Sequence, residues 1–174
     1  MIREKESLSE ILRNAAYAMM SRARTAPKIK GLDLLEMILI EGKEVQKIAD
    51  EIVRLGTLAD LPYYIRDAQA LEKTGAILLI GSKDTQRDLD QCRLCGYKEC
   101  SLKPDHAPCA MTAMELGIAL GSALSAAMDY GIDSRLMLSA AKAAQSLGIF
   151  SQKVHTAIAL PMSISSKNIY FDRS

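Results

Sequence analysis

The sequence predicts an α+β protein in which a small central sheet is packed with helices. Three observations favour this class. Short apolar runs bounded by glycine or proline alternate with helical segments in the first half of the chain. Long helical segments rich in alanine and glycine dominate the second half. The chain has 174 residues, of which 49% are hydrophobic and 25% charged, so we expect a single domain over residues 1–174.

The chain opens with a predicted helix and a predicted strand. Ser7 or Ser9 is placed to cap a helix whose apolar residues recur at helical spacing. This helix should fade before Pro27, because the residue that precedes a proline avoids helical backbone angles. The apolar run over residues 34–40 could form a helix, but its short length and flanking glycines favour a buried strand.

Two more helices and a second strand follow in the first half. Residues 43–55 place apolar side chains on one face and charges opposite, which predicts an amphipathic helix with Gly56 as its C-terminal stop. A third helix should begin near Pro62, which suits a first helical turn, and continue to residue 73. The uninterrupted apolar run over residues 76–80 predicts the most deeply buried strand.

The second half adds two helices of small residues and a last strand. We expect the helices over residues 110–128 and 135–147, and the strand over residues 154–160, with Pro161 as its stop. The first of these helices is long enough to cross a membrane. Its interior Glu115 and its alanine, glycine and serine content instead favour a buried helix, so we expect no membrane span.

The charge balance excludes two classes of partner. Lysine and arginine number 22 against 21 acidic residues, so the formal net charge is +1. Nucleic acids and anionic membranes select basic surfaces, and we therefore expect neither as a partner. Residues 3–6 carry charges where a secretory signal would have an apolar run, which predicts a cytoplasmic protein.

The cysteines all lie in one loop, residues 92–109, which we expect to be inserted between the strand and the helices. They are Cys92, Cys95, Cys100 and Cys109, with the spacing C-x2-C-x4-C-x8-C. In a reducing compartment, cysteines grouped in this way predict a metal or cluster site rather than disulfides. Thiolates are soft ligands that select zinc, copper(I) or iron–sulfur clusters. A [4Fe-4S] cluster fits four cysteines, whereas zinc could use either four cysteines or His106 in place of Cys109, and unmetallated thiols remain a third alternative.

A group of cations lies at the end of the first predicted helix: Arg22, Arg24, Lys28 and Lys30. One interpretation is an anion site for a flavin or substrate phosphate, with Arg22, Arg24 and Lys28 as the candidate binding residues. The alternative is a set of solvated cations that complement the negative end of the helix dipole.

Two features bear on assembly. Gly117 and Gly121 give the helix 110–128 a smooth face, which suits either a dimer interface or close packing within the chain. The apolar residues 169–171 near the C-terminus would be costly to expose, so they should dock on the core or on a partner subunit. From these features we expect a homodimer.

Four motifs together resemble a known family. They are Ala23-Arg24-Thr25-Ala26-Pro27-Lys28, Cys95-Gly96-Tyr97, the stretch from Glu115 to Ala123, and Ser166-Lys167-Asn168-Ile169-Tyr170-Phe171-Asp172-Arg173. Over essentially its whole length, the chain resembles bacterial and archaeal proteins described as containing a ferredoxin domain. The resemblance implies a [4Fe-4S] cluster on all four cysteines, but the family has no established activity. From such a cluster we expect a role in electron transfer or redox sensing, with a redox partner of unknown identity.

The order of the elements also resembles the core of the flavin-dependent nitroreductases. In that superfamily an Ala-Pro loop, here residues 25–28, lies near the flavin ring, and the likeness implies a nitroreductase-like fold. The sequence lacks the basic motif ahead of the first helix and the Asn-x-Gln-Pro run after the loop, so FMN is possible but not favoured. The alternatives to an iron–sulfur redox protein are therefore a zinc-stapled interaction module and an FMN-dependent reductase.

Overall fold

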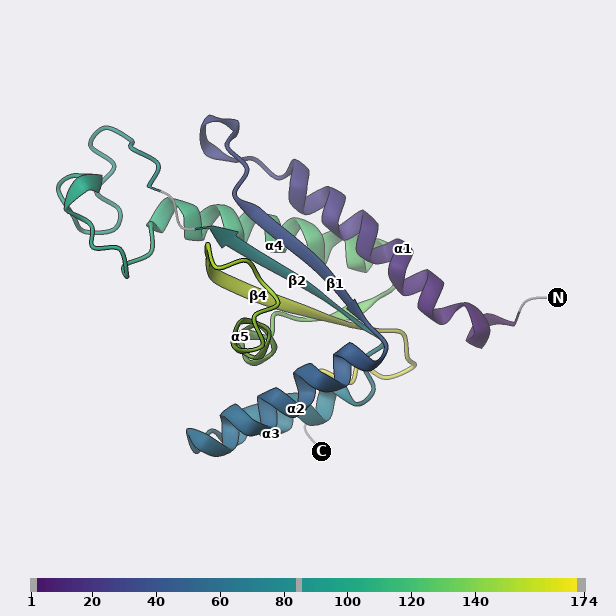
Figure 1. Cartoon of the computed structure of the whole chain (residues 1–174). Coiled ribbons are helices and arrows are strands. Elements are labelled where there is room, and N and C mark those ends of the chain that lie inside the picture. The colour runs from purple at the N-terminus through teal and green to yellow at the C-terminus, as the bar shows by residue number, and fades with distance from the viewer. Residues whose placement is uncertain (1–2, 84–85, 172–174) are drawn as a thin grey trace.

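A four-stranded antiparallel sheet organises the protein, with the strand order β1-β2-β4-β3 (Figure 1). The computed structural model describes residues 3–83 and 86–171. The strands are β1 (Leu35–Glu41), β2 (Ala76–Lys83), β3 (Asp133–Ser134) and β4 (Val154–Ser163). The α+β class predicted from the sequence is confirmed.

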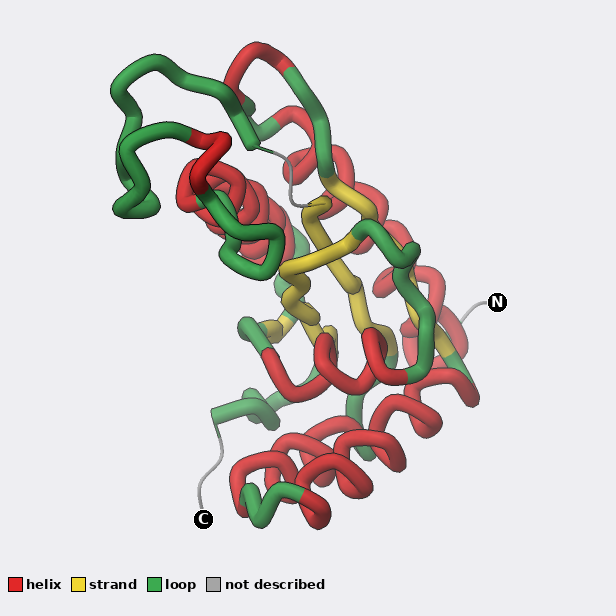
Figure 2. Tube along the Cα trace, turned by 60° about the vertical axis from the view of Figure 1, so that its left-hand side comes forward, coloured by secondary structure: helices red, strands yellow, loops and turns green. Residues whose placement is uncertain are grey.

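Helices cover both faces of this sheet and make a three-layer arrangement (Figure 2). One face carries α1 (Glu4–Thr25) and α4 (Ala110–Asp129), which pack against each other. The other face carries α2 (Lys43–Leu58), α3 (Pro62–Leu71) and α5 (Leu138–Ser146). Two separate apolar cores result, one on each side of the sheet.

The central strand β2 contributes to both cores. Its side chains alternate in direction, so Ile77 and Leu79 join the core under α2, α3 and α5, whereas Leu78 and Ile80 join the core under α1 and α4. All of these side chains are fully buried. An unbroken apolar run is the pattern expected of a strand that is covered on both faces, and that prediction is confirmed.

One boundary predicted for each of the first two helices is wrong. The first helix begins at Glu4 rather than at Ser7 or Ser9, and the Glu6 side chain accepts a hydrogen bond from the backbone N–H of Arg3 at 3.4 Å. The second helix passes through Gly56 instead of stopping there. A side-chain carbon at Gly56 would lie 2.6 Å from the Tyr64 Cβ, so this glycine permits α3 to approach α2 closely.

The last strand also continues through its predicted stop, Pro161. Ala159 exchanges both of its backbone hydrogen bonds with Met137, on the side of the strand away from β2. Two residues further on, Pro161 turns its nitrogen to that same side, so its missing N–H removes no bond to β2. The short, polar strand β3 was not predicted. Helix α5 begins at Leu138 rather than at residue 135.

Helix α4 is the one helix, within residues 3–83 and 86–171, that is long and apolar enough to cross a membrane by length and composition. In the fold it packs on α1 and the sheet through side chains such as Leu116, Ala119 and Ala123. Its interior acid Glu115 is paired inside the protein with Arg87. The position of α4 is that of a core helix, as the sequence predicted.

The apolar tail after β4 is only partly docked. Tyr170 is buried in the core under α2, α3 and α5, and its hydroxyl lies 3.0 Å from the Thr74 hydroxyl. Ile169 packs partly against the same core, whereas Phe171 is 59% exposed.

Burial of Tyr170 gives the protein an alkaline pH dependence. Loss of water contact raises the pKa of Tyr170 from 10.0 to about 12. Between these values the unfolded chain releases the proton and the folded chain keeps it, so the free energy of unfolding should fall as pH rises. We expect Tyr170→Phe to flatten this decline in urea denaturation between pH 10 and 12, relative to a control variant, Tyr130→Phe, at an exposed position. Parallel declines in both variants would contradict the prediction.

Candidate metal-cluster site

The segment that joins β2 to α4 projects beyond the end of the sheet and contains all four cysteines (Figure 1). Apart from a single 3-10 turn, η2 (Cys100–Leu102), its described residues form turns and loops. All four cysteines are free thiols. Cys109 is buried, and the other three are partly exposed.

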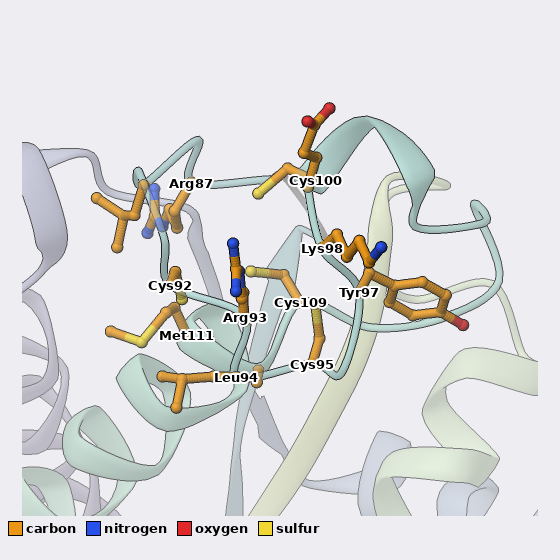
Figure 3. Close-up of a pocket in the computed structure, with 13 residues that line it drawn as sticks. Arg87, Cys92, Arg93, Leu94, Cys95, Tyr97, Lys98, Cys100, Cys109 and Met111 are labelled. Atoms are coloured by element: carbon orange, nitrogen blue, oxygen red, sulfur yellow. The ribbon is translucent and has the colours of Figure 1, made fainter.

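The structure brings the four predicted ligands together. Cys92, Cys95, Cys100 and Cys109 line one pocket (Figure 3). His106, the alternative ligand considered from the sequence, is exposed and lies outside this lining. Across the described chain, no three His, Cys, Asp or Glu side chains converge tightly enough to hold a single metal ion.

A tight turn sends the first two cysteines toward the pocket. The backbone N–H of Gly96 donates to the carbonyl of Arg93 at 2.9 Å, and this bond closes the Cys92–Cys95 bend. Gly96 has a φ of 86°, a left-handed value that glycine adopts without steric cost. Arg93 also has a positive φ, of 49°, which is costly for a residue with a side chain. Backbone strain of this kind is concentrated at functional sites.

Cys109 occupies the N-cap position of α4, where backbone N–H groups point outward. Burial by itself would raise the pKa of the Cys109 thiol. Hydrogen bonds from the Thr112 backbone and hydroxyl, and from the backbone amides of Met111 and Arg87, outweigh burial and hold this pKa below its ordinary value of 9.0. The site thus favours the thiolate, which is the form that binds metal.

A buried ion pair stands beside the cysteines. Arg87 is 3% exposed, lines the pocket, and donates through Nη2 to a carboxylate oxygen of Glu115 and, at 3.2 Å, to the Leu32 carbonyl. The other Glu115 oxygen accepts the backbone N–H of Ile29 at 2.6 Å. Sequence reasoning missed Arg87. The available signal was a lone arginine close before the first cysteine, together with an acid inside an apolar helix.

The three cations predicted to bind an anion are all engaged elsewhere. Arg22 pairs with Asp129 at 3.1 Å, and Arg24 pairs with Asp33 at 2.5 Å. Lys28 donates to the carbonyls of Ala23, Arg24 and Ala26, at 3.1, 2.8 and 2.7 Å, and so closes the C-terminal end of α1. Of the three, Arg22 lines an open groove beside Pro27 and Gly121, and the others do not. The structure does not gather them into one site.

The sheet and its two helical layers define a nitroreductase-like fold, as the sequence predicted. A BluB-like flavoprotein from Clostridium difficile 630 superposes with a TM-score of 0.62 at 16% identity, covering 89% of this chain and 81% of that one. The nitroreductase CinD from Lactococcus lactis, in complex with nicotinic acid, gives 0.62 at 13% identity over 95% and 81% of the two chains. A nitroreductase with bound FMN from Desulfitobacterium hafniense DCB-2 gives 0.59 at 14% identity over 96% and 80%. Identities this low show the fold alone.

Sequence relatives identify the family. A protein of Archaeoglobus fulgidus, described as an uncharacterized protein, is 37% identical over 183 residues, which cover 100% of this chain and 98% of the archaeal protein. The family described as "uncharacterized protein containing a ferredoxin domain" matches residues 105–173, which include Cys109 and all of α4. The chain belongs to this family of ferredoxin-domain proteins.

Proposed function

We propose that the protein is an iron–sulfur redox protein that binds one [4Fe-4S] cluster and transfers or senses electrons. The proposed ligands are Cys92, Cys95, Cys100 and Cys109. The observation that carries the proposal is the arrangement of four free thiols around a single pocket. Membership of a ferredoxin-domain family supports it. When bound, such a cluster supplies one-electron chemistry.

The donor set fits this group, because all four candidate ligands are cysteine thiols. Four thiolates hold a [4Fe-4S] cluster at separate iron atoms, so the ligands must enclose a space. Zinc requires four donors at about 2.0–2.3 Å from one centre. All four thiols line one pocket, which supports a group that takes all four as ligands. The lowered pKa of the Cys109 thiol supports binding of either metal.

Metal analysis and absorbance of anaerobically purified protein test this proposal. A brown protein with about four iron atoms per chain is the expected result. A colourless protein with one zinc would replace the proposal with a zinc-stapled interaction module. A yellow flavin released on denaturation would replace it with an FMN-dependent reductase.

The placement of the site supports electron exchange with a partner. Three of the four cysteines are partly exposed on a loop that projects from the sheet (Figure 1). Electrons would therefore have a short path from the proposed cluster to the surface, where a redox partner would dock. We place the protein in the cytoplasm, because thiols of this kind stay reduced there.

The contacts of Arg22, Arg24 and Lys28 do not favour binding of an FMN phosphate. A flavin phosphate carries nearly two negative charges and needs arginine forks or backbone N–H groups. Arg22 and Arg24 already pair with acids, and Lys28 caps a helix. We therefore expect weak FMN binding or none in a titration that follows quenching of flavin fluorescence. Saturable binding at or below about 1 μM, worth roughly 8 kcal/mol, would contradict this expectation.

We further propose that a second copy of the chain covers the exposed face of α4. Gly117 and Gly121 are exposed, and no described atom outside their own helix neighbourhood lies within 4 Å of a side-chain carbon built at either position. Packing within the described chain therefore does not require these glycines. Ile118 and Met128 are also exposed on this helix, and close helix–helix approach would bury them. Tyr170 of the C-terminal tail belongs to the core on the opposite face of the sheet, so it does not add to the exposed face of α4.

Gly121→Leu should convert the dimer to a monomer. The open space around Gly121 lets the chain accept the larger side chain, whereas a partner helix in close contact could not. Light scattering at high micromolar concentration measures the change. Gln69→Leu, at an exposed position on α3, is the control and should leave the dimer intact. A wild-type monomer under the same conditions would refute the proposed dimer.

A further inference from the structure

Arg87 has hydrogen-bonding capacity that its protein contacts do not use. Its Nη2 serves Glu115 and Leu32, but Nε and Nη1 are buried and have no hydrogen-bond partner among the described residues. A buried donor without a partner is costly, and a guanidinium cannot escape the cost by losing its proton. Such a side chain persists where something else accepts its hydrogen bonds.

The surroundings of Arg87 indicate what that acceptor is. Arg87 lines the same pocket as the four cysteines, and Figure 3 draws its guanidinium on the side of the pocket that holds Cys92 (Figure 3). Thiolates and sulfides of a bound cluster would be anionic acceptors next to these donors.

Glu115 fixes the guanidinium in place. The ion pair is buried at both ends, because the Arg87 and Glu115 side chains are 2% and 7% exposed. Glu115 is itself held by the Ile29 amide, and Arg87 by the Leu32 carbonyl, so the pair ties α4 to the turn before β1. A charge held this rigidly and away from water acts on its surroundings with little screening.

We propose that Arg87 is a positioning residue for the cluster, which donates hydrogen bonds from Nε and Nη1 to its sulfur ligands and raises its reduction potential. Glu115 sets the size of this effect by holding the guanidinium and offsetting part of its charge. The inference rests on the proposed iron–sulfur function. It also predicts opposite shifts for the two partners, because loss of the cation disfavours the added electron and loss of the anion favours it.

The test uses full-length variants reconstituted anaerobically. Their reduction potentials are compared by spectroelectrochemical titration, and the electron paramagnetic resonance spectrum of the reduced state is recorded for each variant. Arg87→Met should shift the one-electron equilibrium at least about tenfold toward the oxidised form, which is 59 mV. Glu115→Gln should shift it the other way. Arg87→Lys should recover part of the loss because it keeps the charge. Lys98→Gln removes an exposed charge from the same pocket and should shift the equilibrium by less than about threefold, because water screens that charge.

The outcomes separate this inference from the function on which it rests. Wild-type protein without an iron–sulfur cluster would overturn both. A wild type with about four iron atoms per chain and an unchanged potential in Arg87→Met would overturn only the role of Arg87. If Arg87→Met fails to hold iron, Arg87→Lys and Glu115→Gln decide the question. If the reduction potentials of Arg87→Lys and Glu115→Gln both shift in the same direction, or if neither shifts, the ion pair is purely structural.

Discussion

Cys95→Ser protein should hold no stable cluster after anaerobic reconstitution, while wild-type protein should hold about four iron atoms per chain. Serine replaces a soft, ionisable thiol with a hard hydroxyl that is rarely ionised, so one of the four cluster positions would lose its ligand. The rest of the protein should still fold. Cys95 lies on the projecting loop and belongs to neither apolar core.

Iron analysis, visible absorbance and urea denaturation together check this expectation. The free energy of unfolding of the apoprotein should stay within about 0.5 kcal/mol of wild type, as for other substitutions outside a core. His106→Ala is the matched control, because His106 is a potential metal ligand on the same loop but lies outside the pocket lining. That variant should keep its full iron content. Full iron content in Cys95→Ser would show that Cys95 is not a required ligand.

Leu78→Ala should lower the free energy of unfolding by about 2–5 kcal/mol. Leu78 lies on the central strand, is fully buried, and faces the core beneath α1 and α4. Truncation removes apolar contacts and leaves a cavity that the strand cannot close, because β2 is hydrogen-bonded to β1 and to β4. Urea denaturation measures the loss.

Leu94→Ala removes the same atoms from a leucine of the cysteine loop that is 58% exposed. It should change the free energy of unfolding by no more than about 0.5 kcal/mol. Comparable losses in both leucine variants would mean that the loop is part of the cooperative core, against the packing described above.

Local patterns predicted much of this fold. The apolar run of β2 needs no partner to be recognised, because a strand covered on both faces is apolar at every position. The four cysteines were likewise recognisable as one site, because they lie within one short segment. In both cases the information is local in sequence.

The features that sequence reasoning missed depend on distant partners. Gly56 is a contact point for Tyr64 and not a helix stop, which only the packing of α3 on α2 reveals. Pro161 sits within a strand because its nitrogen faces away from β2. Arg87 acquires its importance from Glu115, 28 residues further along the chain. Each of these pairings joins segments that are separated in the sequence, so the residues on either side do not identify the partner.

The separation of the cysteine loop from the two cores has a consequence for the order of folding and metal binding. Both cores close without any contribution from Cys92, Cys95 or Cys100. The chain can therefore fold without metal. On the proposed function, it would receive iron and sulfide afterwards, through a pocket in which three of the four thiols are partly exposed. The newly made, metal-free protein would be a stable recipient for cluster delivery, and loss of the cluster to oxygen would leave a folded chain that can be refilled.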